Sequence, residues 1–167
     1  MKNKEELKVD VIEVTVTGTF KTAHVFNAEL GILGVLTLKS GKGEGSFVGA
    51  DDSLLAFNKT SIWKSNYELL QGNEVIASAS PPKKKITRAF NLDFEGEIYT
   101  LSPGGSKRRS WTIKSSPGQA ICEFLPRGAL KRGALIWIQS EIPLALLVFG
   151  YCLVLKRWQE ESAAAAS

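Results

Sequence analysis

One apolar segment near the C-terminus constrains this chain more than any other feature of its sequence. From Ile142 to Leu155 there are fourteen consecutive residues without a charge, an amide, a serine or a threonine. No polar stripe recurs at the helical period of about 3.6 residues, so no face of the segment is suited to water. The segment must therefore be buried on every side, either in lipid or inside the protein.

The same segment has the features of a helix over residues 141–159. Ser140 is suited to be the N-cap, Pro143 would fall in the first turn, and Lys156 would lie in the last turn, where a cation suits the helix dipole. A membrane-spanning helix needs about 20 apolar residues, whereas a run of about 10–14 is more typical of a buried core helix. The length favours a core helix and leaves a transmembrane helix as the alternative.

Most of the remaining sequence is predicted to form short strands. β-branched and aromatic residues alternate with polar ones in these segments, and turn sequences such as Gln71-Gly72-Asn73, Glu95-Gly96 and Ser115–Gly118 separate pairs of them as hairpins. Ten to twelve strands at a spacing of about 8–12 residues are typical of a barrel or a sandwich. The predicted strands cover residues 9–16, 19–28, 30–38, 66–70, 74–79, 89–94, 97–101, 110–114, 119–124 and 134–138, and residues 47–63 hold shorter apolar pieces at 47–48, 54–57 and 62–63.

The strands and the apolar segment together favour one architecture. A barrel with that many strands has a wide interior, and an uncharged helix would fill it. Leu36, Ile98 and Ile136 are expected to face inward. We therefore predict a mainly β fold: an antiparallel barrel of about twelve strands, built from meander hairpins, that encloses a hydrophobic C-terminal helix. The predicted domain covers residues 9–159, with a disordered N-terminus over 1–8 and a disordered tail over 160–167.

Several short motifs in this arrangement resemble the tubby C-terminal-like superfamily, which includes tubby proteins, phospholipid scramblases and LURP-one-related proteins. The resemblance covers about residues 10–158 and lies in these motifs: Tyr67-Glu68-Leu69 with Gly72; Phe94-Glu95-Gly96 with Ile98-Tyr99; Arg109-Ser110-Trp111-Thr112-Ile113 with Gly118; and Ile142-Pro143-Leu144-Ala145-Leu146. It implies a barrel of about twelve strands around a central hydrophobic helix, and for tubby proteins phosphoinositide binding through basic residues. Asp51-Asp52 is too short for a calcium loop of the EF-hand type.

The net charge of +4 is unevenly distributed along the chain. Residues 83–132 hold eleven Lys/Arg and four Asp/Glu, a net charge of +7, whereas residues 1–82 and 133–167 have net charges of −2 and −1. Two basic clusters lie in turns next to neighbouring hairpins and would converge on one rim of a meander barrel. They are the candidate residues for binding anionic phospholipid: Lys83, Lys84, Lys85, Arg88, Lys107, Arg108 and Arg109. The alternative is that these charges only keep an apolar barrel soluble.

The titratable residues do not suggest an enzyme. His24 is the single histidine, so a Ser–His–Asp triad would have to use it, and a metal site usually needs several such ligands; we expect His24 to be structural or at the surface. Cys122 and Cys152 have no motif spacing and are predicted to be reduced packing residues. We expect no metal or cofactor, and no nucleic acid, since no recognised module for it is present.

These observations lead to two hypotheses about function. The first is a non-enzymatic tubby-like domain that binds anionic phospholipid or a protein partner through a basic rim. The second is a membrane-anchored protein with a cytosolic β domain and a C-terminal transmembrane helix. The N-terminus lacks the apolar region of a secretory signal, so we expect a cytoplasmic protein, peripheral at membranes or, in the second hypothesis, single-pass.

Overall fold

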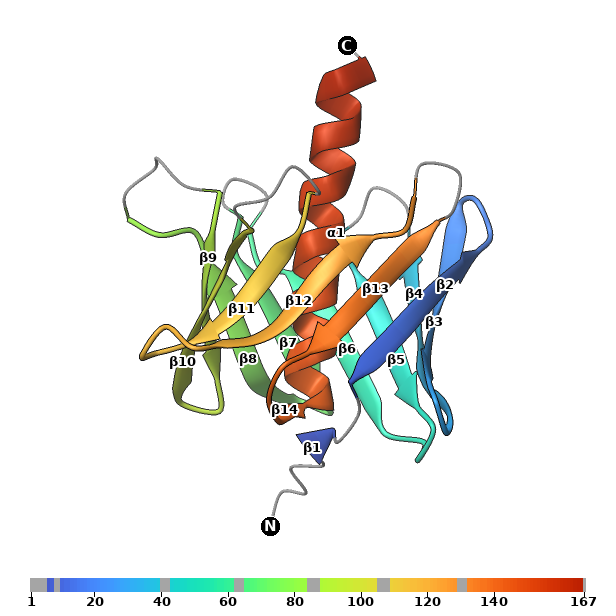
Figure 1. The fold of residues 1–167 in the computed structure, drawn as a ribbon, viewed down its shortest axis with the longest axis horizontal. Coiled ribbons are helices and arrows are strands. Elements are labelled where there is room, and N and C mark those ends of the chain that lie inside the picture. The colour runs from blue at the N-terminus through green and yellow to red at the C-terminus, as the bar shows by residue number, and fades with distance from the viewer. Residues whose placement is uncertain are drawn as a thin grey trace.

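Segments in which apolar and polar side chains alternate form strands in the computed structural model of the chain. The structure describes residues 6–7, 10–39, 43–61, 65–83, 88–104, 109–128 and 132–166 (Figure 1). The strands are β1 (Glu6–Leu7), β2 (Val11–Thr17), β3 (Lys21–Ala28), β4 (Gly31–Lys39), β5 (Gly45–Gly49), β6 (Leu54–Lys59), β7 (Tyr67–Gln71), β8 (Glu74–Ser80), β9 (Phe90–Phe94), β10 (Glu97–Pro103), β11 (Trp111–Ser115), β12 (Ala120–Pro126), β13 (Gly133–Ile138) and β14 (Ile142–Pro143), and the helix is α1 (Leu144–Ala166). The short apolar piece at residues 62–63 lies outside the described residues.

Strands β2 to β13 form a closed antiparallel barrel. Each strand pairs with the next one in the sequence, and β13 pairs with β2, where Ala134 lies opposite Val14. Most inward residues of the strands are apolar, as in β9, where Phe90, Leu92 and Phe94 are buried and the residues between them are exposed. The predicted twelve-stranded meander barrel is therefore confirmed.

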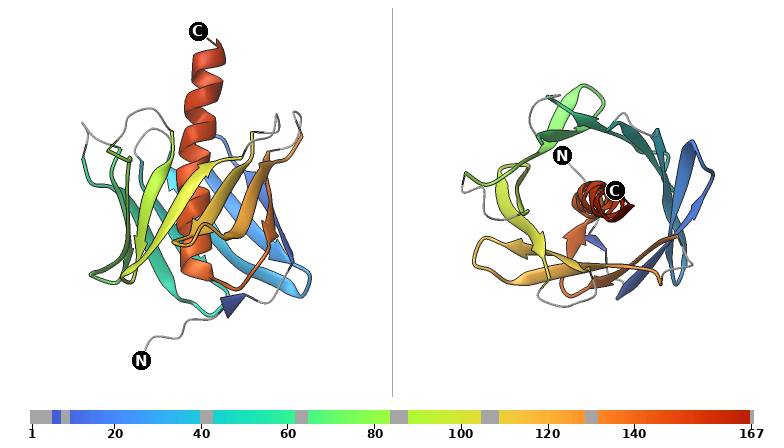
Figure 2. Two further views of the ribbon diagram at one scale, coloured as in Figure 1. Left: turned by 60° about the vertical axis from the view of Figure 1, so that its left-hand side comes forward. Right: turned by 90° about the horizontal axis from the view of Figure 1, so that it is seen from above.

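Helix α1 runs through the centre of the barrel (Figure 2). All its residues from Leu146 to Val154 are buried, whichever way their side chains point. This enclosure explains why the segment has no polar stripe: strands surround it on every side. The apolar segment is thus the core of the protein, as predicted.

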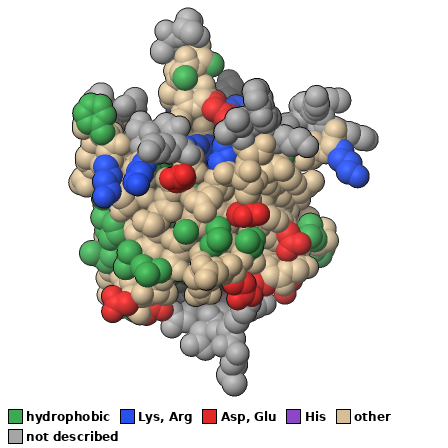
Figure 3. Space-filling model, turned by 180° about the vertical axis from the view of Figure 1, so that it is seen from behind, with side chains coloured by type: hydrophobic (Ala, Val, Ile, Leu, Met, Phe, Trp, Pro, Cys, Tyr) green, Lys and Arg blue, Asp and Glu red, His purple; other side chains and the backbone are tan. Residues whose placement is uncertain are grey.

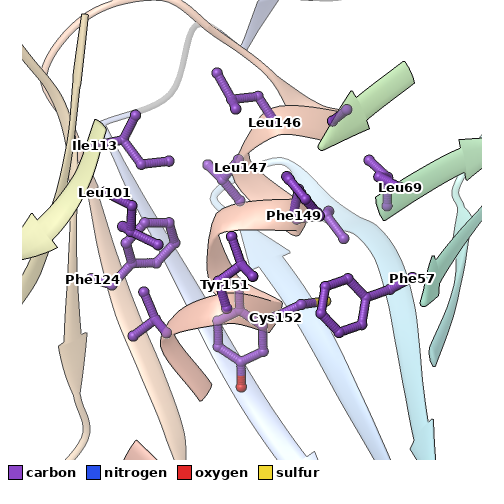
Figure 4. Packing of buried hydrophobic residues seen from close by; sticks show 14 of the residues in the cluster. Phe57, Leu69, Leu101, Ile113, Phe124, Leu146, Leu147, Phe149, Tyr151 and Cys152 are labelled. Carbon is purple, nitrogen blue, oxygen red and sulfur yellow. The ribbon is translucent and has the colours of Figure 1, made fainter. Parts of the chain in front are cut away.

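Aromatic rings make many of the contacts between α1 and the barrel wall (Figure 4). The ring of Phe149 packs edge-on against Phe57 of β6, with 5.9 Å between centroids, and Tyr151 packs against Phe26 of β3 at 5.2 Å. On another side the helix comes closer to the wall. A Cβ at Gly150 would lie 2.7 Å from Ile113 Cδ1 and 3.0 Å from a ring carbon of Phe124, so this position has no room for a side chain.

The helix begins later than predicted. Ile142 and Pro143 are extended and pair with Leu7 and Glu6, so α1 starts at Leu144 and Ser140 is not its N-cap. The residue before a proline avoids the helical region, which favours a strand at Ile142. The prediction that residues 1–8 are disordered is wrong for the two residues of β1, because β14 supplies them with hydrogen-bond partners.

The predicted disordered tail over 160–167 is also wrong for most of its length, since α1 continues to Ala166. Glu160 pairs with Arg157 one turn earlier, and Glu161 pairs with two arginines of the barrel. Alanine has the highest helix propensity, so the run from Ala163 extends the helix. In Figure 1 this end of α1 projects beyond the barrel.

Ile98 points outward, contrary to the inward position that the sequence suggests. It lies opposite Asp93 and is 53% exposed, whereas Leu101 of the same strand lies opposite Phe90 and is buried. Successive residues of a strand face opposite sides, so placing Leu101 inside places Ile98 outside.

We expect that Val148→Asp, in the enclosed part of α1, destabilises the protein by more than ~3 kcal/mol, because it buries a carboxylate without a partner. The measurement is the free energy of unfolding in urea. Val75→Asp, on the exposed outer face of β8, is the matched control and should cost little. Equal stability of the two variants would contradict the central position of the helix.

Removing residues 140–167 should give an insoluble product, because the inward side chains of the barrel, among them Leu36 and Ile136, would then meet water. Expression followed by separation of the soluble and pelleted fractions tests this. A chain that ends at Glu161 keeps the enclosed part of α1 and should stay soluble. A soluble, cooperatively unfolding product of the longer truncation would show that the barrel does not need its helix.

Candidate anion-binding rim

The meander topology sorts the connections between strands onto two rims. Successive antiparallel strands run in opposite directions, so every second connection lies on the same rim. The helix-exit rim, from which the end of α1 projects, holds the connections β2–β3, β4–β5, β6–β7, β8–β9, β10–β11 and β12–β13. The opposite rim holds the others and the segment before α1 (Figure 1).

This sorting separates the charges of the barrel. The described cations at the helix-exit rim are Lys21, Lys39, Lys59, Lys83, Arg88, Arg109, Arg127 and Arg132. The described acidic residues at the opposite rim are Asp10, Glu29, Asp51, Asp52, Glu74, Asp93, Glu95, Glu97 and Glu141. Exceptions exist: Glu44 and Glu68 lie near the helix-exit rim, and Lys114 lies near the opposite one. Figure 3 shows the result on one face, with Lys and Arg in the upper half and Asp and Glu mostly in the lower half.

Two of the predicted binding residues converge on α1. Arg88 Nη1 lies 2.5 Å from Glu161 Oε1, and Arg109 Nε lies 3.0 Å from Glu161 Oε2. The indole Nε1 of Trp158 donates to the backbone oxygen of Arg109 at 2.9 Å. Partial burial alone would raise the pKa of Glu161, but hydrogen bonds and charge from Arg109 and Arg88 outweigh it and lower that pKa. These contacts tie the end of α1 to the β8–β11 side of the rim.

The other predicted residues have different positions. Lys83 is exposed on the same rim, and Lys84, Lys85, Lys107 and Arg108 lie outside the described residues. Glu161 is remote from both arginines in the chain, so its pairing with Arg88 and Arg109 could not be read from the sequence.

Two further arginines of this rim are also engaged. Arg127 Nη2 lies 2.7 Å from Glu13 Oε1, and Arg132 Nη1 donates to the backbone oxygen of Gly18 at 2.5 Å. Within the described part of the chain, by contrast, no ion pair involves the rim lysines. Among the described cations of this rim, Lys21, Lys39, Lys59 and Lys83 are therefore open to an external anion.

A buried polar contact joins the wall to the helix inside the barrel. His24 of β3 is 3% exposed; its Nδ1 lies 2.7 Å from the Tyr151 hydroxyl of α1, and its Nε2 lies 2.9 Å from Thr22 Oγ1. A neutral imidazole can donate from one nitrogen and accept at the other, so it satisfies both groups. Burial, helped by the charge of Arg132, lowers the pKa of His24 to about 4. The role of His24 is thus structural, and its partner on α1 could not be read from the sequence.

The two cysteines are also enclosed in the interior. Cys122 and Cys152 are free and buried, and burial raises the pKa of both thiols, which keeps them protonated. The described residues contain no group of three or more His, Cys, Asp or Glu side chains that could hold a metal ion.

Comparison with protein-family models, curated proteins and solved structures finds no match for this chain. In the part of the chain that the structure describes, no helix combines the length and the apolar character needed to cross a membrane.

The low pKa of His24 predicts a stability that depends on pH. The ordinary value is 6.5 and the folded value about 4, so as the pH falls between these values the unfolded chain takes up a proton before the folded one does. Titration of this group should therefore lower the free energy of unfolding by about 3 kcal/mol at pH ~4, and should not lower it above pH ~7. Urea unfolding at both pH values tests this, with His24→Gln as the control that cannot titrate.

A second measurement makes this test independent of the variant. His24 is the single histidine, so the imidazole proton signals in an NMR titration belong to it alone. We expect a pKa well below the ordinary value. An ordinary pKa, or the same pH dependence of stability in the wild type and in His24→Gln, would show that the imidazole is not enclosed as described.

Proposed function

We propose that this protein is a non-enzymatic binding domain whose helix-exit rim docks on membranes that contain anionic phospholipid. The observation that carries the proposal is the separation of charge between the two rims. Anionic headgroups attract the basic rim and repel the acidic one, so the barrel would approach such a surface in one orientation. We also propose that the protein is cytoplasmic and binds membranes peripherally.

The architecture also supports a proposal about the superfamily to which the chain belongs. A closed barrel of twelve antiparallel strands around a C-terminal apolar helix is what the resemblance to the tubby C-terminal-like superfamily implies. We propose membership of that superfamily on this ground and on the sequence motifs. Phosphoinositides, with several phosphates on one headgroup, are then the natural first lipids to compare with phosphatidylserine.

A protein partner is the second candidate, and a different surface favours it. Val48 and Leu54 lie opposite each other on β5 and β6 and are exposed on the outer wall, as is Val75 of β8. Exposed apolar side chains on neighbouring strands are a common feature of protein interfaces. These residues lie toward the acidic rim, so this surface would not compete with lipid for the basic one.

The lipid proposal predicts binding that depends on charge and on salt. The protein should co-sediment with mixed phosphatidylcholine–phosphatidylserine or phosphoinositide vesicles and not with phosphatidylcholine alone. Binding should weaken as salt increases, because the screening length falls to about 8 Å at ~0.15 M. Since a Lys near an anionic surface contributes about 1 kcal/mol, Lys39→Gln and Lys59→Gln should each weaken binding about fivefold.

Lys114→Gln is the matched control for these variants. It makes the same change of charge at an exposed strand residue, but near the opposite rim. We expect it to bind as the wild type does. Equal recovery with neutral and anionic vesicles, or an equal effect of Lys114→Gln and Lys39→Gln, would refute docking through the helix-exit rim.

A further inference from the structure

The connection between β2 and β3 presents a large apolar side chain to water on the basic rim. Phe20 is 86% exposed, although the side chain of a phenylalanine gains about 1.5–3 kcal/mol when it is removed from water. The turn that carries it is held in place. Gly18 has a positive φ of 89°, which few other residues adopt, and its backbone oxygen accepts from Arg132. The backbone next to Phe20 is therefore held at the rim, with the side chain exposed to water.

Two lysines lie directly beside this turn. Lys21 of β3 and Lys39 of β4 are paired in register, and both are exposed on the outer face. Like charges at opposite positions of neighbouring strands destabilise the pairing. An anion between the two ammonium groups would relieve this repulsion, so the pair is suited to a phosphate or carboxylate from outside.

The rest of the rim restricts how a flat surface can approach. On the β8–β11 side, Arg88 and Arg109 are already paired with Glu161. The end of α1 projects beyond the strands, as Figures 1 and 2 show, and carries Glu160 as well. A flat surface that met the rim squarely would meet this projecting helix end first, and there Glu160 is paired with Arg157 as Glu161 is with the two barrel arginines. An oblique approach from the β2–β4 side avoids it and brings the lysine pair to the surface.

We propose that the β2–β3 turn is the membrane anchor of the protein: Phe20 enters the apolar boundary of the bilayer while Lys21 and Lys39 contact anionic headgroups. This inference rests on the proposed function and identifies the part of the helix-exit rim that performs it. An apolar anchor and a basic patch are two weak signals that together give stable attachment to a surface. Charge alone would hold the barrel near the headgroups, and the ring of Phe20 would fix its orientation.

A single fluorophore can report the insertion directly. Cys122 and Cys152 are 0% and 1% exposed, so Phe20→Cys adds the one reactive thiol among the described residues. An environment-sensitive label on this thiol should shift its emission to the blue when phosphatidylcholine–phosphatidylserine vesicles are added. Leu30→Cys is the matched control, since Leu30 is 97% exposed in the turn at the other end of β3, on the acidic rim. Its label should not respond.

Binding of unlabelled variants gives the second test. Phe20→Ser should weaken binding to the same vesicles about tenfold, because the apolar contribution is lost. Leu30→Ser removes a similarly exposed apolar side chain from the other rim, and Lys114→Gln removes a charge near that other rim. Both should bind as the wild type does. All three side chains are exposed, so thermal unfolding should be unchanged and should confirm that each variant folds.

The outcomes separate this inference from the proposed function. If the wild type binds anionic vesicles but the label on Phe20→Cys stays in water and Phe20→Ser binds normally, the anchor is refuted while docking through the rim stands. Phe20 would then be exposed for a protein partner instead. If the wild type does not bind anionic vesicles at all, both are refuted.

Discussion

The structure depends on the mutual burial of one helix and twelve strands. A barrel of this size without a filling would leave its inward rings and aliphatic side chains around an empty interior, and α1 without the barrel would expose apolar groups on every face. Neither part has an alternative way to remove these surfaces from water, and apolar burial is the dominant favourable contribution to folding. The close approach at Gly150 shows how tightly the two parts fit on the β11–β12 side.

Because the helix is enclosed, a polar side chain inside the barrel needs a hydrogen-bond partner there. The Tyr151 hydroxyl lies on the enclosed face of α1 and needs a partner, since a buried hydroxyl without one is costly. His24 supplies it from the wall and is itself satisfied by Thr22. This polar contact adds orientation to an interface that is otherwise apolar, because rotating α1 within the barrel would separate the two rings.

The exit of the helix makes the two ends of the barrel different. One rim must accommodate the projecting polar end of α1, and it does so with Arg88, Arg109 and the backbone contact to Trp158. Arg88 and Arg109, which belong to the basic clusters of the sequence, are occupied by these contacts. Lys21 and Lys39, which lie outside those clusters, are open on the other side of the rim. The basic rim is therefore not uniform: one side holds the helix and the other is open to the surroundings.

The sequence by itself determined most elements of this fold, because alternation of apolar and polar residues indicates a strand with one buried face, and an uncharged helical segment indicates a helix buried on every side. It did not determine which face of β10 carries Ile98, where α1 begins or that its tail stays helical, since these depend on partners such as Asp93, Leu7 and Glu161 that pairing and packing select. The charge pattern shows the same division. Residues 1–82 are net acidic in sequence, yet their lysines at strand ends join the basic rim and their acidic turns join the other. Only the closed meander decided this, because it assigns each connection to a rim by its place in the strand order and not by its neighbours in the chain.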